Sequence, residues 1–325
     1  MIAHTFHIPE KMILMQKPMM YVCTALAPLV FAAVYLFGWR ALVLVLISLV
    51  FGILTEAFFT FSQGKPVTSA VFVTCLIYGL SLPPTLPFWM AAAGIIFGVG
   101  LGKMAFGGLG QNVFNPAMVG RCFIYITFPV HMTSRWSEPV SGALGGFGSW
   151  TAVDAVTGAT PLTILHKGNT VPLENLFWGY TSGSIGETSV ILIIIGAAYI
   201  IYKKAAPWRM ALSYLLGGIA AAILFFPLST APSFLSPLYV LFAGSFLFGA
   251  AFVVTEPISG AKTKQGQWLY GFAIGFLIIV LRRYSNFSEG LMFSVLLLNA
   301  FVPLIDQAFK KKWDLSLTAS EKEKT

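Results

Sequence analysis

The sequence predicts an all-α polytopic membrane protein with about ten transmembrane helices, arranged as two inverted halves of five helices each. Three observations support this fold class: the composition, the spacing of the apolar segments and the distribution of positive charge. Of the 325 residues, 57% are hydrophobic and only 10% are charged. Soluble globular domains carry about 25% charged residues, so a soluble fold is excluded.

The apolar segments have the length of membrane spans, which is about 20 residues for a helix. Ten such segments occur, near residues 19–37, 41–62, 67–83, 86–104, 113–131, 187–203, 208–227, 237–256, 267–283 and 290–307. A long polar interval, residues 132–186, separates the fifth from the sixth. Because each half holds an odd number of spans, two related halves would insert in opposite directions, which is the architecture of an inverted repeat.

The positive charges predict the orientation. With the N-terminus inside, fourteen of the twenty Lys and Arg residues fall in inner loops and tails, five in outer ones, and Arg121 inside a span. The positive-inside rule therefore predicts both termini in the cytoplasm and residues 132–186 on the outer face of the membrane. The net charge of +8 belongs to this topology and requires no nucleic-acid partner.

The domain organisation follows from these spans. Residues 1–18 form an N-terminal interfacial segment, in which Met12–Met15 between Lys11 and Lys17 predict a short amphipathic helix on the membrane surface, with an unstructured leader as the alternative. A charged tail at 308–325 is expected to be cytoplasmic, solvated and without regular structure. Between them lie the first five-helix half (19–131), the outer loop (132–186) and the second five-helix half (187–307).

The polar outer interval contains the segment Trp150–Leu162. Thr160 followed by Pro161 fits a helix cap with proline at the first helical position, so an ordinary turn and helix start explain the spacing. The alternative is an attachment site for a modifying group, because Gly158 and Ala159 leave the backbone around the Thr160 hydroxyl unobstructed.

A glycine-rich polar break separates the fourth and fifth spans. It contains Gly107, Gly108, Gly110, Asn112 and Asn115. Irregular backbone at membrane depth is tolerated where it is packed in protein or lines a cavity. A tight loop between closely packed helices and a cofactor-binding loop both remain open.

Four acidic residues lie in or at the ends of predicted spans: Glu56, Glu256, Glu289 and Asp306. An ionised group at the bilayer centre costs roughly 2.5–3.5 kcal/mol on insertion scales, so such groups face protein or water. We interpret all four as ion-pathway candidates, Glu56 above the others, and interfacial placement is the alternative for the rest. Arg121 has no acidic residue near it in the sequence, and Glu56 is a candidate partner on another helix.

Three motifs resemble one family of membrane redox pumps. Residues 154–160, Asp-Ala-Val-Thr-Gly-Ala-Thr, resemble the flavinylation motif in which the final threonine carries FMN through a phosphoester. Residues 103–120 and the pattern from Glu289 to Asp306 match two further family patterns. From about Met12 to Asp306, the chain resembles the RnfD/NqrB family, whose paralogous members are membrane subunits of the Rnf complex and of the sodium-pumping NADH:quinone oxidoreductase (Nqr).

The resemblance implies covalent FMN on Thr160 at the outer side and a second, non-covalent flavin (riboflavin) in the membrane domain. The motif residues Asp154, Thr157, Gly158 and Ala159 surround the attachment site, with Asp154 assigned to the flavin transferase that installs FMN. If the second flavin lies near the inner face, the amides of Asn112 and Asn115 suit the edge of its ring. Trp150 is a candidate to stack on the covalent flavin.

The function implied by this resemblance is that of an electron-relaying membrane subunit of a ferredoxin:NAD oxidoreductase of the Rnf type, which translocates Na⁺ or H⁺ across the bacterial cytoplasmic (inner) membrane. The sequence has no dinucleotide fingerprint, and Cys23, Cys75 and Cys122 lie far apart, so partner subunits must carry the NAD, ferredoxin and iron–sulfur sites. The chain should be inactive alone. The early first span and Gly107–Asn112 favour the Rnf type, whereas Arg121 favours the quinone-reductase paralogue. A secondary transporter or channel without flavin is the alternative from another class.

Overall fold

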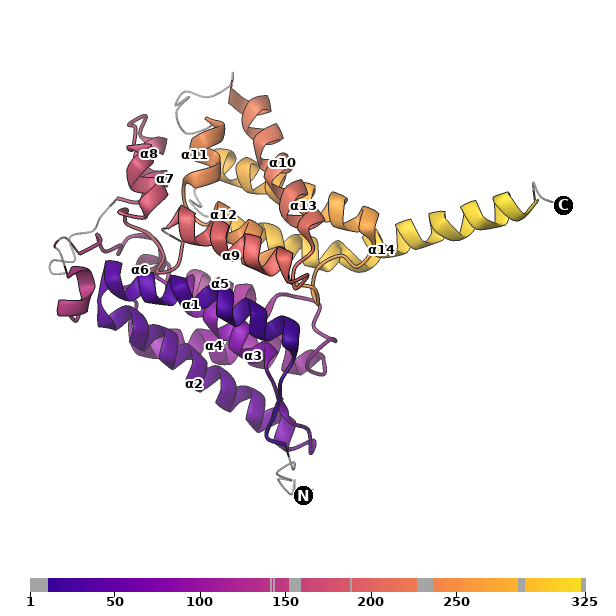
Figure 1. Cartoon of the computed structure of the whole chain (residues 1–325), viewed down its shortest axis with the longest axis horizontal. Coiled ribbons are helices and arrows are strands. Elements are labelled where there is room, and N and C mark those ends of the chain that lie inside the picture. Colours follow the sequence, from indigo (N-terminus) through magenta and orange to yellow (C-terminus); the bar gives the residue numbers. More distant parts are fainter. Residues whose placement is uncertain are drawn as a thin grey trace.

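The computed structural model describes residues 11–140, 142, 144–151, 159–187, 189–226, 236–285 and 290–322, with side chains as far as Lys310. Its described part is mostly helical, and helices from the two halves of the sequence form two adjacent bundles (Figure 1). Six helices in this part are long and apolar enough to cross a membrane: Lys17–Phe37, Trp39–Phe61, Phe88–Phe106, Trp208–Phe225, Lys264–Tyr284 and Leu291–Lys310. The chain is therefore an integral membrane protein.

Five helices build the first bundle. They are α1 (Lys17–Phe37), α2 (Trp39–Phe61), α3 (Ala70–Leu80), α4 (Phe88–Gly102) and α5 (Pro116–Thr127). A 3₁₀ turn (Met104–Phe106) follows α4, and the glycines after it take positive φ angles, 107° at Gly107 and 95° at Gly108. Only glycine adopts these angles without strain, so the loop predicted between the fourth and fifth spans is built on glycine geometry.

The second bundle has the same order of elements with one interruption. It contains α9 (Val190–Tyr202), α10 (Trp208–Phe225), α11 (Pro237–Phe242), α12 (Phe246–Phe248), a π-helix (Gly249–Val253), α13 (Lys264–Tyr284) and α14 (Leu291–Lys322). Between the bundles, the chain forms α6 (Pro129–Thr133), a 3₁₀ turn (Gly145–Gly148), α7 (Pro161–His166) and α8 (Leu173–Trp178). The helices α6, α7 and α8 lie at one end of the molecule, and the charged end of α14 projects from the other (Figure 1).

Equivalent helices pack alike in the two bundles. Helix α2 packs on α4 and α4 on α5, just as α10 packs on α13 and α13 on α14, and α1 meets α9 while α5 meets α14 between the bundles. The third segment of each bundle is unusual in the same way: α3 has only 11 residues, and its counterpart is broken into α11, α12 and the π-helix at Gly244, where φ is 68°. Both bundles therefore have a short or interrupted third segment.

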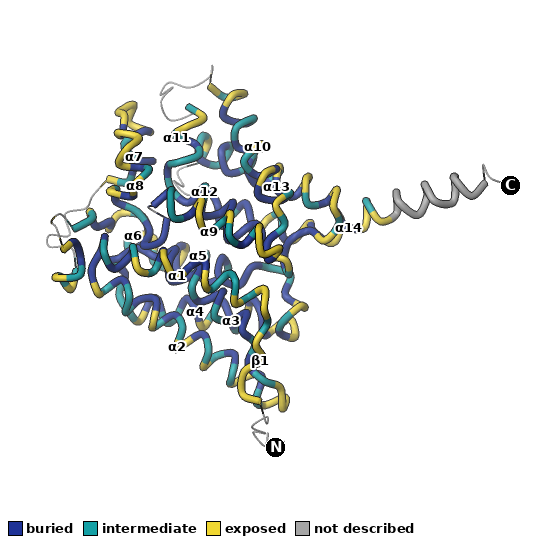
Figure 2. Tube along the Cα trace, in the orientation of Figure 1, coloured by how far each residue is buried: buried dark blue, intermediate teal, exposed yellow. Residues whose placement is uncertain are grey.

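The outward faces of the helices carry large apolar side chains. Phe31, Phe58 and Ile223 are each more than 60% exposed, while the buried residues follow the inner faces of both bundles (Figure 2). A soluble protein seldom exposes so much contiguous apolar surface, whereas in a bilayer this surface contacts lipid tails.

Two predictions at the chain ends were wrong. In place of an amphipathic helix at Met12–Met15, residues Ile13–Leu14 form strand β1, which pairs in parallel with β2 (Val67–Thr68). Backbone bonds to residues 67–69 outweigh the helical pattern, and Pro18 in the first turn of α1 prevents that helix from extending backward. At the other end, the tail predicted to lack regular structure is helical to Lys322.

Candidate functional site

Thr160 caps helix α7. Its Oγ1 accepts the backbone N–H of Thr163 at 3.3 Å, and the two hydroxyl groups lie 2.9 Å apart. Pro161 follows at the first helical position, so the local geometry agrees with the capping pattern in the sequence. The hydroxyl of Thr160 is half-buried at the end of the molecule formed by α6, α7 and α8.

Two cavities adjoin this threonine. A small, nearly enclosed one is lined by Thr160 itself together with Trp136, Ser184, Glu187 and Gly244. A larger one, about 620 Å³, is lined by the residues on either side, Ala159 and Pro161, and by Glu138, Asn175, Tyr180 and Thr181. Ligand pockets for small molecules measure about 300–1,000 Å³, so the larger cavity has the size to take a flavin ring.

The rest of the predicted flavin motif lies partly outside the described residues, which exclude Asp154, Thr157 and Gly158. Trp150 is described and is 54% exposed, and its ring meets Phe88 edge-on at 6.5 Å rather than lining either cavity beside Thr160. The structure therefore does not bring Trp150 together with Thr160.

Two titratable side chains flank the Thr160 region. Partial desolvation and the positive charges of Arg282 and Arg283 lower the pKa of His166, which favours its neutral form at pH 7. A hydrogen bond with Tyr35 raises the pKa of Tyr180, which lines the larger cavity. The positive charge on this flank comes from the arginines and not from His166.

Arg121 pairs with Glu187 and not with Glu56, the partner suggested by the sequence. Its Nη1 lies 3.0 Å from Oε1 of Glu187 and also donates to the carbonyl of Ser81, while Nη2 lies 3.4 Å from the hydroxyl of Ser184. Arg121 is 2% exposed and Glu187 6%. The pair joins α5 of the first bundle to the segment that leads into α9.

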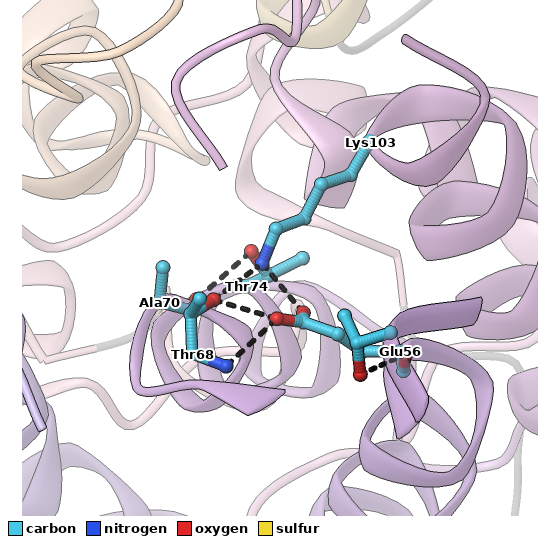
Figure 3. A network of polar contacts seen from close by, with 6 residues as sticks. Glu56, Thr68, Ala70, Thr74 and Lys103 are labelled. Atoms are coloured by element: carbon cyan, nitrogen blue, oxygen red, sulfur yellow. Dashed lines mark hydrogen bonds and ion pairs between the residues drawn. The ribbon is translucent and has the colours of Figure 1, made fainter. Parts of the chain in front are cut away.

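Glu56 pairs with Lys103, a partner that no pattern in the sequence indicated (Figure 3). Nζ of Lys103 lies 2.5 Å from Oε2 of Glu56, and both side chains are at most 2% exposed. Thr68 binds both groups: its N–H and hydroxyl donate to Oε1 of Glu56, at 2.9 and 2.6 Å, and its hydroxyl accepts from Nζ at 3.0 Å. Every described polar atom in this site has a partner, so the carboxylate is neutralised within the protein.

Asp306, near the end of the membrane-spanning part of α14, is held differently. Its carboxylate accepts the backbone N–H groups of Lys262 and Thr263, at 3.0 and 2.9 Å, and the hydroxyl of Thr263 at 2.7 Å. Neutral dipoles satisfy this group, and no salt bridge to it occurs among the described residues. The carboxylate lies at the rim of a cavity.

That cavity measures about 630 Å³ and lies between the two bundles. The first bundle contributes the Gly-Asn loop, including Gly110 and Asn112, and the second contributes Ser259, Asn299 and Asp306. Nδ2 of Asn112 donates to the carbonyl of Phe114 at 3.1 Å. The structure thus brings Asn112 and Asp306, two predicted site residues from distant parts of the sequence, to one cavity.

Asn115 has a structural task. Its Oδ1 accepts the N–H groups of Ala117 and Met118 and so caps α5, while its own N–H donates to Oδ1 of Asn299 at 3.2 Å. Asn299 in turn donates to the hydroxyl of Tyr270 at 2.8 Å. Asn115 therefore ties the bundles together, which leaves Asn112 as the better placed of the two predicted flavin contacts.

Of the other predicted acids, Glu256 follows the π-helix and accepts the hydroxyl of Ser259 at 2.5 Å, and Glu289 lies outside the described residues. No cluster of three His, Cys, Asp or Glu residues in the described part of the chain could hold a metal ion. Three residues that sequence reasoning missed are Lys103, Thr68 and Glu187. Lys103 and Glu187 are charged residues at the ends of apolar segments, and this position was the only signal for them in the sequence.

A family model described as the NQR2, RnfD, RnfE family matches residues 2–313. The RnfD-type subunit of the ion-translocating oxidoreductase complex of Stutzerimonas stutzeri is 34% identical over 329 residues, which cover 90% of each chain. The NqrB-type subunits of the Na⁺-translocating NADH-quinone reductases of Yersinia pestis and Pseudomonas aeruginosa (strain LESB58) are 39% and 37% identical over 77% of this chain, which spans only 62% of their length.

Proposed function

The chain belongs to the NQR2, RnfD, RnfE family, and from that premise we propose that it is the electron-relaying membrane subunit of an ion-translocating oxidoreductase, with FMN esterified to Thr160. The observation that carries this proposal is the position of the Thr160 hydroxyl, half-buried beside a cavity of about 620 Å³. A flavin accepts and donates one or two electrons, so it links two-electron and one-electron carriers.

The residues around Thr160 fit such a group. The larger cavity offers polar partners for the ring, including Asn175, Tyr180 and Thr181. Esterification would replace the hydroxyl proton of Thr160, and its oxygen would remain next to the N–H of Thr163. A covalent link keeps a water-exposed cofactor at a fixed local concentration, so the cofactor is not lost by dissociation over many turnovers.

The second flavin belongs, in this proposal, in the 630 Å³ cavity between the bundles. Asn112, Asn299, Asp306 and Lys262 line this cavity, and the amide group of an asparagine is of the kind that suits the edge of a flavin ring. An electron carrier beside Asp306 places redox charge next to an acid that forms no salt bridge in the described part of the chain. That arrangement is how we propose that electron transfer acts on the movement of Na⁺ or H⁺.

We assign the complex to the Rnf type, with both termini cytoplasmic, ten spans and the Thr160 region on the outer side. The match over 90% of an RnfD-type relative supports the Rnf assignment, although the quinone-reductase relatives are slightly more identical over a shorter stretch. Partner subunits would carry the NAD, ferredoxin and iron–sulfur sites, and a flavin transferase would install the FMN.

In-gel flavin fluorescence tests the central proposal. The chain is produced with a flavin transferase, denatured on a gel and viewed under ultraviolet light, together with Thr160→Ala and a matched control, Thr163→Ala. We expect fluorescent bands for the wild type and the control and a dark band for Thr160→Ala. A dark wild-type band, or a fluorescent Thr160→Ala band, would exclude the covalent link at this residue.

A secondary transporter or channel without flavin remains the rival, because the broken third segments and the polar interface between the bundles suit ion passage by themselves. Turnover of the assembled complex separates the two functions. If the flavin relays electrons, Thr160→Ala stops donor-to-acceptor electron transfer. If the chain only transports ions or supports assembly, electron transfer continues at the wild-type rate.

A further inference from the structure

We propose that the buried Arg121–Glu187 pair, together with residues 184–187, forms the closed gate of an ion passage between the two bundles. This inference rests on the proposed ion-translocating function but not on the flavin. Its basis is the way in which the segment leading into α9 is fastened across the end of α3.

The backbone of this segment is bonded to the first bundle. The N–H of Ile185 donates to the carbonyl of Leu82 at 3.0 Å, and the N–H of Gly186 donates to that of Leu80 at 2.7 Å. The two chains are in such close contact that a Cβ atom on Gly186 would lie 2.6 Å from Cβ of Leu80. Residues 184–187 are therefore packed directly against the end of α3.

Two charged side chains, Arg121 and Glu187, also lie at the end of α3. Arg121 reaches from α5 to the carbonyl of Ser81, to Ser184 and to the carboxylate of Glu187, and these residues are at most 6% exposed. Breaking a buried ion pair by removing one partner costs about 3–5 kcal/mol, so the pair holds the segment firmly. A buried arginine in a narrow passage also repels cations.

The position of the pair along α5 makes it a barrier. Arg121 follows Asn115 by six residues, which corresponds to about 9 Å along a helix. The N–H of Asn115 donates to Asn299, which lines the cavity at Asp306. On the other side, Glu187 and Ser184 line the small cavity that contains Thr160. Contacts of α5 thus lead from Asn299, which lines the cavity at Asp306, to Ser184 and Glu187, which line the cavity at Thr160.

The gate opens when Glu187 leaves Arg121 and residues 184–187 detach from Leu80 and Leu82. The released carboxylate then offers a cation an anionic ligand on the path from the inner cavity to the outer end. Because Glu187 borders the Thr160 cavity, any charge introduced into that cavity would lie close to the pair.

The test is passive ion leak in the assembled complex, reconstituted in liposomes without any electron donor, with a sodium-sensitive dye and a pH-sensitive dye inside. Gly186→Ala inserts a methyl group against Leu80 without altering charge, and Arg121→Gln removes the cation that blocks the passage. We expect each to raise the leak of Na⁺ or H⁺ about tenfold or more, and tenfold corresponds to about 1.4 kcal/mol in the opening equilibrium.

Two controls accompany these variants. Gly148→Ala adds a methyl group where no atom lies within 4 Å and should leave the leak unchanged. The exchanged pair, Arg121→Glu with Glu187→Arg, should be tighter than Arg121→Gln alone. Fully assembled Gly186→Ala and Arg121→Gln complexes with wild-type leak would overturn the gate.

Hydrogen exchange of the wild-type complex tests the gate without any variant, so it does not depend on whether a variant assembles. The amides of Ile185 and Gly186 should be protected at rest and exchange faster during turnover, because opening breaks their bonds to α3. Equal protection at rest and in turnover refutes the gate. Neither readout depends on flavin fluorescence, so a dark wild-type band would overturn the attachment at Thr160 and leave the gate to be judged by its leak.

Discussion

Glu56 and Asp306 are both acids near the predicted inner ends of spans, one in each bundle, but the protein stabilises them in opposite ways. Glu56 faces Lys103 at 2.5 Å and is fully buried, so its site is neutral and closed. Asp306 accepts only N–H and hydroxyl donors and borders a cavity of about 630 Å³. The contrast teaches that burial of an acid does not by itself mark an ion site, because what matters is whether a protein cation already neutralises it.

The largest expected effect concerns the closed site. Glu56→Gln leaves the ammonium of Lys103 buried without an anion, so we expect a loss of about 3–5 kcal/mol in stability. Thermal unfolding of the purified complex measures this loss, and the double variant with Lys103→Met should recover most of it. An unchanged unfolding temperature for Glu56→Gln would show that the pair does not hold this site.

Thr68→Val examines the third member of the same site. The substitution keeps the shape of the side chain but removes the hydroxyl that donates to Glu56 at 2.6 Å and accepts from Lys103 at 3.0 Å. The unsatisfied buried groups should cost about 1–3 kcal/mol, again read from thermal unfolding. Thr127→Val, at an exposed threonine bonded only within its own helix, is the matched control and should differ little from the wild type.

Asp306→Asn tests the open site, where we expect a small structural effect and a large functional one. The amide oxygen still accepts from Lys262 and Thr263, and exchanging a charged for a neutral acceptor should cost about 1 kcal/mol. Turnover, however, should require a higher Na⁺ or H⁺ concentration, because the cation loses its anionic ligand. Identical cation dependence in variant and wild type removes Asp306 from the ion path.

The smallest effect should come from Lys310→Gln. This lysine follows Asp306 by one helical turn on α14 and is exposed, so its loss should change stability by no more than about 0.5 kcal/mol. Lys103→Gln, which leaves the carboxylate of Glu56 buried alone, should cost several times as much. Similar costs for the two lysines would erase the distinction between the open and the closed site.

Features with a local signal in the sequence were predicted well. Hydropathy over about 20 residues predicted helices that the structure places within a few residues of the expected spans, such as Trp208–Phe225 for 208–227. The Thr160-Pro161 pair predicted a helix cap, and Thr160 does cap α7. These features depend on neighbours along the chain, which the sequence displays directly.

Features that depend on distant partners were missed. The pairing of Ile13 with Val67 converts an expected helix into a strand, and Lys103 reaches Glu56 from 47 residues away. Arg121 binds Glu187, which lies 66 residues further along, at the start of the predicted sixth span. No periodicity or spacing in a single sequence specifies which charges meet, because the packing of the helices decides it.

The Glu56–Lys103 pair also has a consequence for biosynthesis. When α2 leaves the ribosome, its buried carboxylate has no counter-charge, because Lys103 is synthesised 47 residues later. Ionised groups inside a membrane are costly, and Glu56 lies five residues before the end of α2, so we expect the second span to be the weak point of co-translational integration. We therefore expect α2 to be retained at the translocon until α4 and Lys103 have been synthesised.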